Sequence, residues 1–265
     1  TGTTYDLNAG AVDPDWATDG TNAKVTHVAF DPSFAEVRPT FTCYWFYEMR
    51  KLESIAGMDY LNTSEVTRMD AMFYRCYKLT VLDLGSFNTS SVTNMWGMFE
   101  NCNNLAELDI SSFDTSNTFE MDEMFLSCSS LKALDLSNFD MSSVTSASNM
   151  FEGCKALSRI KTPVNVPEGL KIALPIEMTD KDGNTYEYLS NGNDSAESIE
   201  LYVEEPSEWY ECYKYTLDTT NRIIYLNESK GFLKGNVTVS ANASIDGVDY
   251  AVVLDPADRN NGGEY

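Results

Sequence analysis

The stretch MFYRCYKLTVLDLGSF, residues 72–87, decides the fold because its pattern returns at a constant step of 26 residues. Apolar columns keep the phase through four units, and a fixed period of this kind marks a repeat architecture. The cysteine column consists of Cys76, Cys102, Cys128 and Cys154. The two columns before it are Met72, Met98, Met124 and Met150, then Phe73, Phe99, Phe125 and Phe151.

A fifth, degenerate copy precedes these four. Trp45-Phe46 stands where Met72-Phe73 stands later, and Met49 takes the cysteine position. Terminal repeats are expected to be atypical because one of their faces lacks a repeat neighbour.

Each unit predicts two elements. Leu82 and Leu84 flank a polar Asp83, which is typical of a short strand with one buried face. In residues 92–102 the apolar positions step by 3, 4 and 3, which predicts one face of a helix. One such unit cannot bury its apolar face alone, so we expect the units to stack into a solenoid with parallel strands on one side.

The repeat resembles the leucine-rich repeats of the BspA-type bacterial surface proteins, including a repeat first catalogued in mycoplasma surface lipoproteins. The resemblance covers roughly residues 43–163 and rests on Leu-x-x-Leu-x-Leu after Met-Phe-x-x-Cys-x-x-Leu. Ala147, where the pattern has Met, and Phe119 depart from it. The resemblance implies an α/β fold, a right-handed leucine-rich-repeat solenoid with parallel strands on one face. Alternating residues near the end of the chain add a small β-rich C-terminal unit. It also implies an extracellular location on a bacterial cell surface and a role in adhesion.

The period divides the chain. We expect an N-terminal cap over residues 1–42, the repeats over 43–163, a β-rich exit cap over 164–206 and a small β-rich domain over 207–265. Hairpins are predicted around residues 180–183, 219–221 and 246–247. Residues 2–7 resemble residues 247–252, which indicates that the last domain could lead into a further array.

Composition excludes some functions. The chain has 18 Lys and Arg against 41 Asp and Glu, a net charge of −23. This balance argues against nucleic acid and anionic membrane surfaces, which attract basic proteins. No apolar run is long enough to span a bilayer, so we expect no membrane insertion in this segment. The chain begins without Met or a signal peptide, and we expect it to be a processed or trimmed piece.

The cysteine column could be redox-active, metal-binding or structural. The parallel side chains of stacked repeats point the wrong way for a disulfide, and Met49 shows that the position accepts an apolar group. We therefore expect unpaired, buried thiols, while Cys43 and Cys212 are left unassigned. No CxxC motif occurs and His27 is the single histidine, so we expect no zinc, other metal or cofactor.

Two acidic features are candidate sites. Residues 180–185 hint at a calcium loop, but the Gly and Glu that an EF-hand requires are absent at its sixth and twelfth positions, so a hairpin turn is favoured. Asp83, Asp109 and Asp135 share one column, with Glu107 beside Asp109. Such a column attracts a cation or a basic partner, or it reflects a structural need for a short polar residue.

Trp96 is the aromatic candidate, because its column otherwise holds Asp70, Asp122 and Ser148 and so suggests exposure. The alternative is that its ring folds down over its neighbours. We find no phosphate loop, nucleophile elbow or histidine-based triad, so no catalytic residue is predicted. The sequence favours a monomeric, non-enzymatic module that binds a protein or matrix ligand, including host molecules. A passive spacer in a larger surface protein is the alternative, and an enzyme is a distant third.

Overall fold

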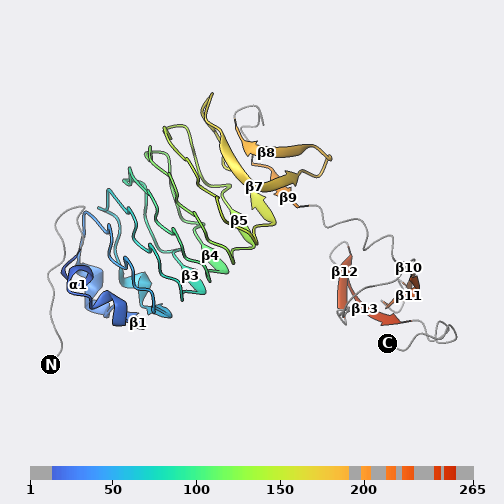
Figure 1. The fold of residues 1–265 in the computed structure, drawn as a ribbon, viewed down its shortest axis with the longest axis horizontal. Helices are drawn as coiled ribbons and strands as arrows, with labels where there is room; N and C mark the ends of the chain where they lie inside the picture. The colour runs from blue at the N-terminus through green and yellow to red at the C-terminus, as the bar shows by residue number, and fades with distance from the viewer. Residues whose placement is uncertain are drawn as a thin grey trace. The chain divides into compact units, whose positions relative to one another are not determined.

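The computed structural model describes residues 14–190, 198–203, 213–218, 223–229, 242–245 and 248–254. The chain forms two compact units, Thr1–Val203 and Glu204–Tyr265. Residues 2–7, Cys212 and the expected turns at 219–221 and 246–247 lie outside the described residues. Figure 1 shows the repeats of the first unit as successive turns of chain that lie side by side.

The predicted fold class, an α/β right-handed leucine-rich-repeat solenoid with parallel strands on one face, is wrong. The described residues contain one α-helix, α1 (Asp15–Thr18), and three separate short 3-10 turns. These turns are η1 (Asn22–Lys24), η2 (Pro32–Glu36) and η3 (Met58–Tyr60). The described strands fall into separate small sheets of two to five strands, so no continuous strand face forms.

The predicted helices fail because each repeat contains two left-handed residues four positions apart. In the third unit these are Gly97, with φ 55°, and Asn101, with φ 59°. The same two positions in the preceding unit are Ala71 and Arg75, with φ 48° and 58°. A left-handed residue cannot continue a right-handed helix. The apolar spacing of 3, 4 and 3 therefore belongs to a chain of tight turns.

Backbone hydrogen bonds in this segment alternate between two kinds of acceptor. The N–H of Phe73 donates to the carbonyl oxygen of Met98 in the next repeat, at 2.9 Å. The N–H of Cys76 donates back to the carbonyl oxygen of Phe73, at 3.1 Å, and closes a local turn. With these two kinds of bond, the buried backbone N–H and C=O groups find partners both within a repeat and in the neighbouring repeat. It holds neighbouring repeats together without a helix.

Each repeat contributes one strand of three residues. In the five repeats these strands are β2 (Ser54–Ala56), β3 (Val81–Asp83), β4 (Glu107–Asp109), β5 (Ala133–Asp135) and β6 (Arg159–Lys161). β1 (His27–Ala29) has the same length and lies before the first repeat. The expected parallel pairing of β3 with β4 is confirmed, with Leu82 opposite Leu108. β1 pairs with β2 and β5 with β6 in the same sense, whereas β4 and β5 belong to different sheets.

Antiparallel strands follow the last repeat. β7 (Ile172–Thr179) and β8 (Thr185–Leu189) form the hairpin predicted around residues 180–183. β9 (Glu200–Tyr202) joins both β6 and β7 in antiparallel pairing, which extends this sheet to the order β5-β6-β9-β7-β8.

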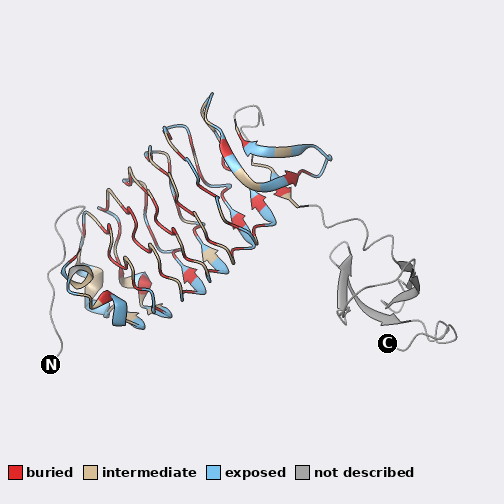
Figure 2. Ribbon diagram, viewed as in Figure 1, coloured by how far each residue is buried: buried red, intermediate tan, exposed pale blue. Residues whose placement is uncertain are grey.

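Buried apolar columns form the core of the first unit. Figure 2 shows buried positions recurring at the same place in successive repeats. The phenylalanine rings stack almost parallel, with centroids 5.7 Å apart between Phe73 and Phe99 and 5.5 Å between Phe99 and Phe125. Met98 and Cys102 beside them are fully buried. Each column contributes one side chain per repeat, so each repeat adds one layer to the core.

The second unit contains a four-stranded sheet of order β10-β11-β13-β12. β10 (Tyr213–Asp218) pairs antiparallel with β11 (Ile223–Ser229), and β12 (Asn242–Ile245) with β13 (Val248–Leu254). Both strand pairs were expected from alternating apolar residues. The parallel pairing of β11 with β13 was not expected.

Candidate functional site

The acidic residues singled out from the sequence lie at or beside the ends of three short strands. We call them the acidic strand ends: Asp83, Glu107, Asp109 and Asp135, all of which are exposed. Asp83 ends β3 and is the register partner of Asp109 at the end of β4. Asp135 ends β5, in another sheet, where its register partner is Lys161. The structure therefore brings Asp83 and Asp109 together and gives Asp135 a basic neighbour.

Each of these aspartates also closes a local turn. The Oδ1 atoms of Asp83, Asp109 and Asp135 accept hydrogen bonds from backbone N–H groups two residues later, at 2.9, 2.9 and 3.0 Å. Short acidic side chains favour such turns because they replace a missing backbone acceptor. The repetition of Asp in this column therefore has a structural cause, because Oδ1 of each aspartate closes the turn. Oδ2 of each aspartate takes no part in that turn hydrogen bond.

Hydrogen bonds lower the pKa of two of the acidic strand ends, Asp109 and Asp135. Hydrogen bonds from the hydroxyl and the N–H of Ser111 lower the pKa of Asp109. Partial burial raises the pKa of Asp135, but hydrogen bonds from Lys161 and Ser137 outweigh it and lower that pKa. The Nζ of Lys161 lies 2.6 Å from Oδ2 of Asp135. At neutral pH the carboxylates of Asp109 and Asp135 therefore carry negative charge.

The surrounding sequence contains no compensating cation. Residues 79–131 include eight Asp and Glu but no Lys or Arg. β3 and β4 fall within this stretch, whereas Lys161 pairs with Asp135 at the next strand pair. Asp83, Glu107 and Asp109 are consequently the part of the acidic strand ends whose charge is least balanced.

Trp96 lies apart from the acidic strand ends, in the turn-rich segment of its repeat. It is partly buried, and its backbone N–H donates to Oδ1 of Asn94 at 2.8 Å. The polar column that suggested exposure is itself mixed, because Asp70 is buried and paired with Arg68. A polar column therefore does not by itself predict an exposed surface in this fold.

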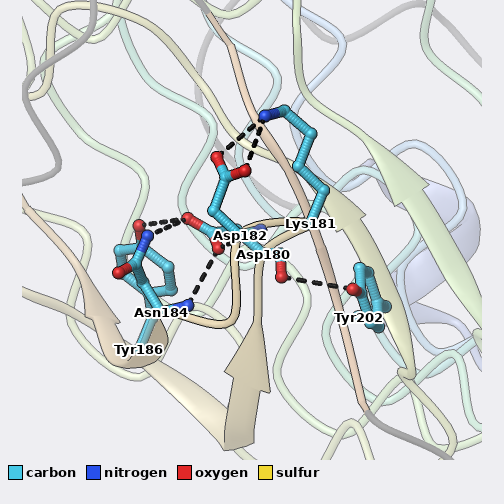
Figure 3. A network of polar contacts seen from close by, with 6 residues as sticks. All are labelled: Asp180, Lys181, Asp182, Asn184, Tyr186 and Tyr202. Atoms are coloured by element: carbon cyan, nitrogen blue, oxygen red, sulfur yellow. Dashed lines mark hydrogen bonds and ion pairs between the residues drawn. The ribbon is translucent and has the colours of Figure 1, made fainter.

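The Asp180 loop is a hairpin turn, as the sequence favours. Its carboxylate accepts hydrogen bonds from the backbone N–H groups of Asp182 and Asn184, the amide of Asn184 and the hydroxyl of Tyr186 (Figure 3). These donors, Asn184 foremost, hold the pKa of Asp180 well below its ordinary range. The carboxylate oxygens are thus already occupied by protein donors.

The four cysteines of the column are free and buried. Each thiol donates to the carbonyl oxygen of a phenylalanine in the preceding repeat, such as Cys102 to Phe73 at 3.1 Å and Cys128 to Phe99 at 3.1 Å. Burial raises the pKa of Cys102 and of Cys154 to about 12. Sequence reasoning treated the position as apolar and missed this donor role.

Two further features were missed from the sequence. A cavity of about 430 Å³ lies near η2, lined mainly by apolar side chains that include Trp16, Phe30 and Phe46. Asp31 is the one ionisable residue of its lining, and its carboxylate accepts the N–H of Ser33 at the start of η2. The second feature is a basic and aromatic patch on the two turns that precede β2 and β3.

The described residues contain neither a metal-binding cluster nor a membrane-spanning helix. No group of three or more His, Cys, Asp or Glu side chains in these ranges is arranged to hold a metal ion. In the same parts of the chain we find no helix with the length and apolarity needed to cross a bilayer.

Comparison with known proteins adds one finding. Residues 42–162 match a family described as Mycoplasma protein of unknown function, DUF285. The match spans the repeats and ends just after β6. No curated protein and no solved structure matches the chain.

Proposed function

We propose that this chain is a non-enzymatic binding module of a bacterial cell surface. Its acidic strand ends take a basic partner, a protein or an extracellular-matrix ligand. The similarity of residues 42–162 to a mycoplasma family supports a bacterial source, and that family's function is unknown. The surface location and the adhesive role are parts of the proposal.

The observation that carries the proposal is the pairing of Asp83 with Asp109. These exposed carboxylates are direct register partners within a stretch that has no Lys or Arg. Like charges placed opposite each other destabilise a strand pair by a few tenths to about 1 kcal/mol. A bound cationic side chain relieves this repulsion, so a basic ligand gains free energy here that it does not gain at isolated acids.

Catalysis has less support. The cavity near η2 contains one ionisable residue, Asp31, and its carboxylate is engaged with Ser33. General acid–base chemistry needs titratable groups whose pKa values are separated by unlike environments. A repeated column of aspartates provides similar environments instead.

A passive spacer is the second candidate function. The turn role of the aspartates and the ion pair of Asp135 with Lys161 favour it, because both give the acids a structural use. Under this alternative the acidic column serves folding and solubility, and no partner depends on it.

The test compares two triple variants on an array of basic and matrix proteins at low salt. Asp83→Asn/Asp109→Asn/Asp135→Asn removes the charges, yet Asn can still accept the turn hydrogen bonds. Asp59→Asn/Glu177→Gln/Glu187→Gln removes the same charge from exposed positions elsewhere.

The proposal expects the first variant to lose the array signals and the second to keep them. Unchanged binding by the first variant would show that the acidic strand ends are not the binding surface. Absence of any partner for the unmodified chain would favour the spacer.

A further inference from the structure

Basic and aromatic side chains gather on the turns that precede strands β2 and β3. We call this cluster the basic turn patch, and it consists of Arg50, Lys51, Tyr74, Arg75, Tyr77 and Lys78. All six side chains are exposed or partly exposed. The patch lies immediately before the stretch 79–131, which has no Lys or Arg. The basic charge of this part of the chain is therefore concentrated in one place.

Glu48 links the two arginines across adjacent repeats. Its Oε1 atom accepts from Nη2 of Arg50 at 2.9 Å and from Nη1 of Arg75 at 2.6 Å. Glu48 pairs with two of the four cations, and Glu100 lies close enough to Arg75 to interact with it. The four cations outnumber these two carboxylates, which leaves the patch with a positive excess. An arginine has five N–H donors, so further donors remain on both guanidinium groups beyond those that Glu48 engages.

Tyrosine rings hold the guanidinium groups in place. Arg75 lies over the ring of Tyr74, 4.8 Å from its centroid, and Arg50 lies over the ring of Tyr77 at 6.0 Å. Cation–π contacts of this kind restrict the long arginine side chains before any ligand arrives. Because the arginine side chains are already restricted, they lose less conformational entropy when a ligand binds.

We propose that the basic turn patch binds a carboxylate-rich segment of a partner protein. Guanidinium groups pair with carboxylates through two parallel hydrogen bonds, and Tyr and Arg are enriched among residues that dominate binding energy. The rings of Tyr74 and Tyr77 already carry guanidinium groups, which disfavours stacking of a sugar ring there. The site goes beyond the proposed function, because it is independent of the acidic strand ends and takes the opposite charge.

The net charge of −23 does not prevent such binding at physiological salt. The Debye length is then about 8 Å, so acids farther from the patch are largely screened. Direct contacts at the two arginines act within that distance. We therefore expect selective binding at about 0.15 M salt.

The experiment measures fluorescence anisotropy of a labelled octaglutamate peptide with the full chain at this salt concentration. Arg50→Gln/Arg75→Gln is expected to weaken binding about fivefold or more, as the loss of two exposed charge-assisted contacts implies. The matched control is Lys132→Gln/Lys155→Gln, which removes the same charge. Lys155 occupies the column of Arg50 and Tyr77 in the last repeat, and both control lysines are exposed.

Retained binding by the control and loss in the arginine variant support the proposal. Lys51→Gln/Lys78→Gln leaves the hydrogen bonds of Glu48 intact and should also weaken binding. This second variant tests the patch even if the arginine variant loses stability. Three results would overturn the proposal: no binding by the unmodified chain, equal loss in variant and control, or binding of heparin in place of the peptide.

Discussion

The thiol of Cys102 donates a hydrogen bond to the carbonyl oxygen of Phe73, 3.1 Å away in the preceding repeat. The same oxygen accepts the backbone N–H of Cys76, at 3.1 Å. One carbonyl therefore joins a turn within a repeat to the core of the next repeat. This explains why the position recurs as cysteine rather than as any apolar residue of similar size.

Removal of this donor should destabilise the repeats. Cys102→Ala is expected to lower the free energy of unfolding by about 1–2 kcal/mol, through the lost hydrogen bond and the small cavity left behind. Cys102→Ser keeps a donor and should cost less. Urea unfolding curves measure both, and a serine variant less stable than the alanine variant would show that the position is purely apolar.

The column cysteines should be unreactive in the folded protein. Burial raises the pKa of Cys102 and Cys154 to about 12, so little thiolate exists at pH 8. Iodoacetamide should modify Cys76, Cys102, Cys128 and Cys154 only after denaturation, and without prior reduction. Mass spectrometry distinguishes the states, and a disulfide between any two of the four would contradict the structure.

The phenylalanine stack should dominate stability. Phe99 is fully buried between Phe73 and Phe125, and Phe99→Ala should cost about 3–5 kcal/mol as a large core truncation. Phe119 is 46% exposed and provides the control. Phe119→Ala should change stability by less than about 1 kcal/mol. Similar losses in the two variants would argue against the stacked core.

Stability should depend on pH through Glu100. Burial, with the nearby carboxyl of Glu123, raises the pKa of Glu100 to about 7, while Arg75 opposes this shift. The folded state then binds an extra proton between about pH 4.5 and 7, so this group's contribution falls as the pH rises through that window. Glu100→Gln should reduce the decline between pH 5.5 and 8, as thermal unfolding would measure. An unchanged pH profile would contradict this assignment.

Sequence alone predicted the repeat, its apolar columns, the strand at Leu82 and the Asp180 hairpin, because burial on one face and turn chemistry are local properties. It could not predict the turns at Gly97 and Asn101. Their apolar spacing matches one helical face, and the left-handed backbone depends on hydrogen bonds to the next repeat. The apolar spacing therefore predicted a helix in a segment where hydrogen bonds between repeats produce tight turns.

The candidate site was predicted in part. Regular spacing placed Asp83 beside Asp109, because neighbouring strands of the repeat pair in register. The pairing of Asp135 with Lys161 was missed, although Lys161 is the next member of the aspartate column at the 26-residue step. The basic turn patch was missed because Arg50 and Arg75 occupy different positions of the repeat and meet only through Glu48.

The most direct test of the central claim is a titration of ¹⁵N-labelled chain with an octalysine peptide, followed through backbone amide shifts at low salt. The amides of Gly85 and Ser111 donate to the carboxylates of Asp83 and Asp109 and report on their charge environment. The account predicts saturable shifts centred on these two amides, and their loss in Asp83→Asn/Asp109→Asn. Shifts centred elsewhere, or unchanged in that variant, would contradict it.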